Sequence, residues 1–299
     1  MDWMICREGL FGIVVALAAL TGCASGVTSD EPTDTTADRK IPREAEGQRA
    51  EMLSAFFGLD NTLPPLANLI CTGAPGKDGM PVIFSTEIDH TTMQAGDFKV
   101  TTRSGETGVV HCVSLLPATD AGELRTVLLV GEFGNASDDP PARVEIIGHV
   151  ESIDGTLDFK GSSIKVTPLE PGPTLVMAQI VSDDEEDMGL GLPRTKGSEC
   201  PAQGIAQKVR VVWAGGVTLE NGDEPGDKER ELYKVTSQSA EGKRREVVPV
   251  ALADLGDGDN NHLLCLDTQD KPISVAFPAG ILTDPNDDLN PATSVVVQD

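Results

Sequence analysis

Aromatic side chains are scarce in this chain of 299 residues, where Phe, Trp and Tyr together make up 4%. Basic residues are also few, because 23 Lys and Arg stand against 48 Asp and Glu, and the formal net charge is −25. A surface of this sign repels nucleic acid and anionic lipid head groups. So few rings also argue against a stacking platform for bases. The composition therefore excludes nucleic acid as a partner and favours cations or basic proteins.

Motifs of enzymatic catalysis are missing as well. The chain contains no G-x-S-x-G, no H-E-x-x-H, no phosphate loop and no dinucleotide fingerprint. Glu87 and Asp89 share one face of a predicted strand and could form a carboxylate pair for acid–base chemistry, although a solvated polar face is the simpler interpretation. We therefore expect a protein that is not an enzyme. The alternative is a secreted hydrolase with a carboxylate- or metal-based site.

The N-terminal region contains an apolar run from Leu10 to Leu20, which is too short to span a bilayer as a helix. It ends in Leu20-Thr21-Gly22-Cys23, which resembles the lipobox of bacterial lipoproteins. That resemblance implies a signal peptide over residues 1–22 and acylation of Cys23, with palmitate among the chains, as a membrane anchor. The residue after Cys23 is not the Asp that retains such proteins in the inner membrane. The implied location is the bacterial cell envelope, with the outer membrane favoured, on its periplasmic or exposed side.

Composition changes along the chain suggest its domain organisation. The helical spacing of Ala50, Leu53, Phe56 and Phe57 predicts one short helix over residues 45–59, after a polar, Thr- and Asp-rich segment. We expect a lipidated disordered tether over residues 23–44, the helix with a first β-sandwich domain over 45–182, an acidic linker over 183–199, and a second β-sandwich domain over 200–299.

Short β-branched runs separated by Gly, Asp and Pro turns predict strands in both halves of the chain. In the first half these runs cover residues 81–85, 97–102, 109–115, 125–131, 143–151, 164–169 and 174–181. In the second they cover 207–213, 217–219, 231–236, 246–252, 262–267, 272–277 and 294–297. The predicted fold class is all-β, with two tandem immunoglobulin-like sandwiches.

One segment of the first half supports this fold class by resemblance. Residues 81–93 (PVIFSTEIDHTTM) and 97–100 (DFKV) are similar to the opening of the immunoglobulin-like modules of bacterial surface-layer and adhesin proteins. The resemblance implies a sandwich fold and extracellular display, and it transfers no functional residue. We expect a non-catalytic, lipid-anchored envelope or surface protein that acts as a binding module for a protein or envelope partner.

Four cysteines remain beyond the lipobox, namely Cys71, Cys112, Cys200 and Cys265. An even number of cysteines in an exported protein predicts two disulfides. Three pairings are open, and we favour Cys71–Cys112 with Cys200–Cys265 because each pair then stays within one predicted domain. Zinc is the competing interpretation, but the chain has no C-x-x-C spacing.

Two loops of the second half concentrate acidic and amide oxygens around flexible residues. The candidate metal ligands are Asp254, Asp257 and Asp259 in one loop and Asp284, Asn286 and Asp288 in the other. Calcium prefers six to eight oxygen ligands of this kind, although neither loop fits the helix–loop–helix calcium template. Ordinary Asx-rich turns explain the same pattern. Calcium is thus the one cofactor that the sequence suggests, and both interpretations stay open.

Overall fold

The computed structural model describes residues 40–45, 48–181 and 199–298. The predicted signal peptide, Cys23 and nearly all of the predicted linker lie outside these residues. Within the described part, no helix is long and apolar enough to cross a membrane. Strands are the main secondary structure of the described residues, and the helices there are short. They are the 3-10 helices η1 (Pro65–Leu69), η2 (His90–Thr92) and η3 (Ala95–Asp97) and the single-turn α1 (Asp227–Arg230).

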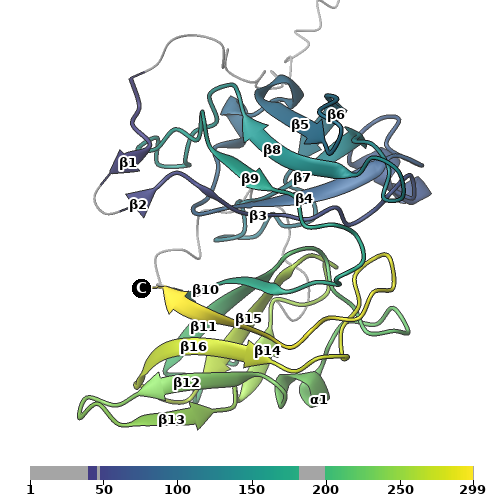
Figure 1. The fold of residues 1–299 in the computed structure, drawn as a ribbon. Helices are drawn as coiled ribbons and strands as arrows, with labels where there is room; N and C mark the ends of the chain where they lie inside the picture. Colours follow the sequence, from purple (N-terminus) through teal and green to yellow (C-terminus); the bar gives the residue numbers. More distant parts are fainter. Residues whose placement is uncertain (1–39, 46–47, 182–198, 299) are drawn as a thin grey trace, which may run out of the picture. The chain divides into compact units, whose positions relative to one another are not determined.

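Two antiparallel sheets form the first β sandwich (Figure 1). The four-stranded sheet has the order β3 (Met52–Ala55), β4 (Asp78–Phe84), β7 (Thr126–Glu132), β6 (Val109–Ser114). The three-stranded sheet has the order β5 (Phe98–Thr102), β8 (Pro141–Ile146), β9 (Ser163–Lys165). Alternate residues of both sheets enter one core, where the ring of Phe84 meets Phe98 and Phe159 edge-on. The segment that resembles surface-protein modules covers the second half of β4, the whole of η2 and the first half of β5.

The helix predicted over residues 45–59 is absent from the described residues of that segment, and the prediction was wrong. This segment forms β1 (Glu44–Ala45), which pairs with β2 (Gln48–Arg49), and then β3 at the edge of the four-stranded sheet. Strand β3 is covered on both faces, because Met52 faces the first core while Leu53 packs against Met177 and Val212 of the second sheet. Burial on both faces removes the alternation that would have indicated a strand.

A second core is enclosed by one eight-stranded sheet. Its order is β13 (Arg244–Val247), β12 (Lys234–Gln238), β16 (Lys271–Phe277), β17 (Thr293–Gln298), β10 (Leu175–Val181), β11 (Gln207–Trp213), β15 (Asn261–Leu266), β14 (Ala251–Ala253). Residues from both halves of this order, such as Val235 and Leu264, share one apolar cluster around Trp213 and Phe277. The sheet therefore folds over on itself, and the chain is all-β with two sandwich-like cores, as predicted.

Strand β10 differs from its expected place. The sequence assigns it to the first sandwich as the last strand before residue 182. In the structure it pairs antiparallel with β11 and parallel with β17, in the middle of the second sheet (Figure 1). Periodicity indicates that a strand exists but not which strands it pairs with, so a boundary after Val181 separates β10 from its partners.

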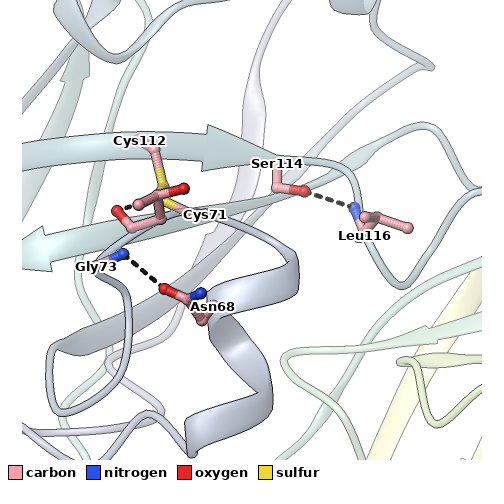
Figure 2. The surroundings of a disulfide bond; sticks show 7 residues. Asn68, Cys71, Gly73, Cys112, Ser114 and Leu116 are labelled. Carbon is pink, nitrogen blue, oxygen red and sulfur yellow. Dashed lines mark hydrogen bonds between the residues drawn. A yellow bond between two sulfur atoms is a disulfide. The ribbon is translucent and has the colours of Figure 1, made fainter. Parts of the chain in front are cut away.

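Both favoured disulfides are present. Cys71, which follows η1, bonds to Cys112 of β6, and Cys200 bonds to Cys265 of β15. Figure 2 shows the first of them beside a turn in which the amide of Gly73 donates to Asn68 Oδ1 at 3.0 Å. Each disulfide joins a loop residue to a strand of one sandwich, β6 in the first and β15 in the second, and the sequence separations are 41 and 65 residues.

The two sandwiches touch through β3, β4, β10 and β11. Ile83 of β4 is buried against Met177 and Val212. Two polar contacts extend this apolar junction: Arg210 Nη2 donates to the carbonyl of Ala121 at 2.6 Å, and Asn260 Nδ2 donates to Thr126 Oγ1 at 3.1 Å. The first contact joins β11 to the loop before β7, and the second joins the loop before β15 to the first residue of β7, so the two loops lie at the same junction.

Candidate functional site

Five carboxylates from these two loops form one cluster. The loop between β6 and β7 provides Asp120 and Glu123, and the loop between β14 and β15 provides Asp254, Asp257 and Asp259. One oxygen from each of Asp120, Asp254 and Asp257 lies within 4.8 Å of the others, and the same holds for Glu123, Asp257 and Asp259. The sequence identified the three aspartates of the second loop and missed the two residues from the first.

The first of the loops is held by hydrogen bonds that leave its carboxylates close to the second. Glu123 Oε2 accepts from the amide of Asp120 at 2.9 Å, and Glu87 Oε1 accepts from the amide of Gly122 at 2.9 Å. Gly122 has a φ of +84°, and a β-carbon there would overlap the guanidinium of Arg210. Only glycine fits this conformation without strain, so the loop places Asp120 and Glu123 in a defined position.

The second loop is held mainly through its backbone amides. The carboxylate of Glu224 accepts from the amides of Gly256 and Gly258, the latter at 2.9 Å. Asp259 Oδ1 accepts from the amide of Asn261 at 2.7 Å. Asp254 has a φ of +65°, which is uncommon for a non-glycine residue. The chain thus turns tightly enough for its aspartates to converge.

Burial and like charge dominate the electrostatics of the cluster. Glu123 is 0% exposed, Asp254 4% and Asp259 6%. Burial, followed by the neighbouring aspartates, raises the pKa of Glu123 and of Asp259 well above the ordinary values. Burial and Asp254 raise the pKa of Asp257 to about 6. The guanidinium of Arg210 opposes this effect at Glu123.

Two buried oxygens of the cluster have no hydrogen-bond donor among the described residues. They are Glu123 Oε1 and Asp254 Oδ2. The two carboxyl groups lie close enough to share a proton, which also raises the pKa of Glu123. A buried acceptor without a partner is costly, so this pair needs either a proton or a cation between its members.

The other acidic loop that the sequence suggested, with Asp284, Asn286 and Asp288, has a different arrangement. Asp284 Oδ1 accepts from the amides of Asn286 and Asp288 at 2.9 and 3.0 Å, and Asn286 Nδ2 donates to Asp288 Oδ2 at 2.7 Å. These contacts are those of an Asx turn. In the described part of the chain, three close Asp, Glu, His or Cys groups occur only in the cluster above. Calcium binding by Asp284, Asn286 and Asp288 stays a prediction.

Glu87 and Asp89 do not form the carboxylate pair that the sequence left open. Glu87 is 6% exposed and turns to the amide of Gly122, whereas Asp89 Oδ1 accepts from the amide of Thr91 at 2.9 Å. The two side chains therefore serve different backbone groups. Glu87 is a support of the loop that carries Asp120 and Glu123.

An apolar cavity of about 170 Å³ lies beside the cluster. Its lining comes from both sandwiches and includes Phe56, Leu63, Pro81, Gly215 and Asn260. Asp259 also borders it, so the cavity and the carboxylates are neighbours.

Comparisons with known proteins give little for this site. No family model matches the chain, and no curated protein matches it. Solved structures of a bacterial S-layer protein, SbsC, are similar to it at 13%, 12% and 11% identity with TM-scores of 0.28, 0.26 and 0.27. These alignments cover 83–85% of this chain but only 26%, 44% and 41% of the SbsC structures. At such scores the similarity carries no argument about fold or function.

Proposed function

We propose that this protein is a non-catalytic component of the bacterial cell envelope, anchored by lipid at Cys23, and that it binds a protein or envelope component through its β sandwiches. The observation that carries the proposal is one disulfide in each sandwich. Disulfides persist in oxidising compartments outside the cytoplasm and are rare within it. The lipobox supplies the route by which the chain would reach such a compartment.

The buried histidines and the four cysteines beyond the lipobox make contacts within the fold. His149 Nδ1 is paired with Asp158, and its Nε2 lies 2.9 Å from Lys160 Nζ. The ring of His262 is hydrogen-bonded to the hydroxyl of Tyr233. All four cysteines beyond the lipobox are bonded in disulfides. These common catalytic groups are therefore engaged in structural contacts.

A hydrolase is the second candidate, because a cluster of carboxylates with raised pKa values lies beside a cavity. Its innermost members argue against substrate access, since Glu123 and Asp259 are 0% and 6% exposed. A panel of ester, glycoside and phosphate substrates tests it. Hydrolysis that disappears in Asp257→Asn would favour the hydrolase over the binding module.

Cell fractionation of a Cys23→Ser variant tests the anchor. The acyl chains attach to this thiol, so the variant should leave the membrane fraction and appear among soluble proteins. Cys6→Ser is the matched control, because Cys6 lies within the predicted signal peptide, and it should leave anchoring unchanged. Membrane association of Cys23→Ser equal to that of the parent protein would contradict the proposal.

A further inference from the structure

We propose that the five-carboxylate cluster is a binding site for a divalent cation of the calcium type. Its ligands are Asp120 and Glu123 from the first sandwich and Asp254, Asp257 and Asp259 from the second. The inference is independent of the proposed function, because it depends on these two loops alone.

The orphaned oxygens at the centre of the cluster point to an occupant. Glu123 is fully buried, yet its Oε1 has no hydrogen-bond donor among the described residues. The buried Asp254 Oδ2 also lacks a donor there. A proton shared by these two groups would remove one charge and leave the other carboxylates repelling each other. A divalent cation meets both needs, since it coordinates the orphaned oxygens and offsets the repulsion.

The ligand chemistry selects calcium over other cations. Every proposed ligand atom is a carboxylate oxygen, whereas zinc sites draw on Cys and His. Calcium takes six to eight oxygens in irregular geometry, and magnesium demands a near-ideal octahedron with several waters. Carboxylates from two separate loops form two groups of three that share Asp257, each group lying within 4.8 Å, and this arrangement suits the larger and more tolerant ion.

Access to the site is provided by its outer members. Asp120 and Asp257 are half-buried, whereas the other three carboxylates are buried. An ion would therefore enter past Asp120 and Asp257 and stop at Glu123. Because the ligands come from both sandwiches, the bound ion would join the loop before β7 to the loop before β15.

Calorimetric titration and thermal melting of the purified full chain test the proposal. After removal of metal with EGTA, calcium should bind and raise the melting temperature well beyond sodium chloride of equal ionic strength. Asp257→Asn keeps the size and the acceptor of the side chain but removes one charge. It should weaken calcium binding by at least about tenfold. The same variant should melt at a higher temperature than the parent in EGTA, because it relieves repulsion.

Glu123→Gln should likewise weaken calcium binding and raise the melting temperature in EGTA. If that variant does not fold, the test depends on Asp257→Asn, because Asp257 is only half-buried. Asp267→Asn is the matched control, since it makes the same charge change at an exposed residue after β15, and it should leave both measurements unchanged. Equal effects of calcium and sodium chloride would overturn the proposal and leave a shared proton as the explanation. So would a calcium response lost in Asp284→Asn but kept in Asp257→Asn.

Discussion

At the scale of single residues, burial keeps His262 neutral, because it lowers the pKa of the imidazole to about 4. The indole Nε1–H of Trp213 donates to the Tyr233 oxygen at 3.1 Å, and the Tyr233 hydroxyl is in turn hydrogen-bonded to His262 Nδ1 at 2.7 Å. The neutral ring therefore ends a buried, hydrogen-bonded row of three side chains.

This environment predicts a specific loss of stability in acid. Between pH 6.5 and about 4 the unfolded chain protonates this histidine and the folded chain does not. Stability conferred by the neutral ring is complete above pH 6.5 and declines as the pH falls, by up to about 3 kcal/mol. His262→Asn keeps an acceptor for Tyr233 but does not titrate. Denaturant unfolding of both proteins across this pH range should show the free energy of unfolding of the parent falling relative to that of His262→Asn as the pH is lowered. A difference in free energy of unfolding that does not change with pH would contradict a neutral His262.

At the scale of elements, β7 depends on a glycine where β6 approaches it. Gly131 pairs with Asp78 of β4 on one side and with Val110 of β6 on the other. A β-carbon at this position would overlap the carbonyl oxygen of Val109 and the ring of Phe133. Neither the backbone of a paired strand nor a buried ring can move aside cheaply.

Gly131→Ala should therefore destabilise the protein by about 3 kcal/mol or more. Gly96→Ala is the matched control, because a β-carbon there meets nothing within 4 Å, and it should change stability little. Urea unfolding of the two variants makes the comparison. Equal stability of both variants would mean that β6 and β7 can separate without cost.

The strands were predictable from sequence to different degrees. Alternation of apolar and polar residues located β5 and β8, but with different accuracy: β5 begins within one residue of the prediction, whereas β8 ends five residues before the predicted residue 151. β3 is buried on both faces, and its apolar residues happened to match helical spacing. Pairing partners were not readable, and β10 is the example, because its neighbours β11 and β17 follow it in the chain.

The candidate site could be predicted only in part, because contacts between distant segments are not visible in the sequence. Asp254, Asp257 and Asp259 stand in one acidic loop, and their density made them visible. Asp120 and Glu123 flank an ordinary Ala-Gly pair and gave no signal. Their role depends on a contact across more than 130 residues, shown by the hydrogen bond from Asn260 to Thr126. Such proximity is a property of the folded chain and not of local composition.

At the scale of the whole molecule, each sandwich carries its own covalent constraint. Closing loops of 41 and 65 residues should stabilise by about 4 kcal/mol each in the chain-entropy model. The double variant Cys71→Ser/Cys112→Ser should lose about this amount in denaturant unfolding. The variant Cys200→Ser/Cys265→Ser should lose a similar amount. A loss below about 1 kcal/mol for either pair would contradict the model for that loop.

The position of β10 in the middle of its sheet also has a consequence for folding during synthesis. Synthesis runs from the N-terminus, so β10 emerges about 110 residues before β17, the strand that joins the two halves of its sheet. Until then β10 has an open edge, and open edges are templates for pairing with other chains. Pairing over such a sequence distance is also slow. During biogenesis the second sandwich therefore passes through a stage in which one edge of its central strand, Leu175–Val181, is unpaired.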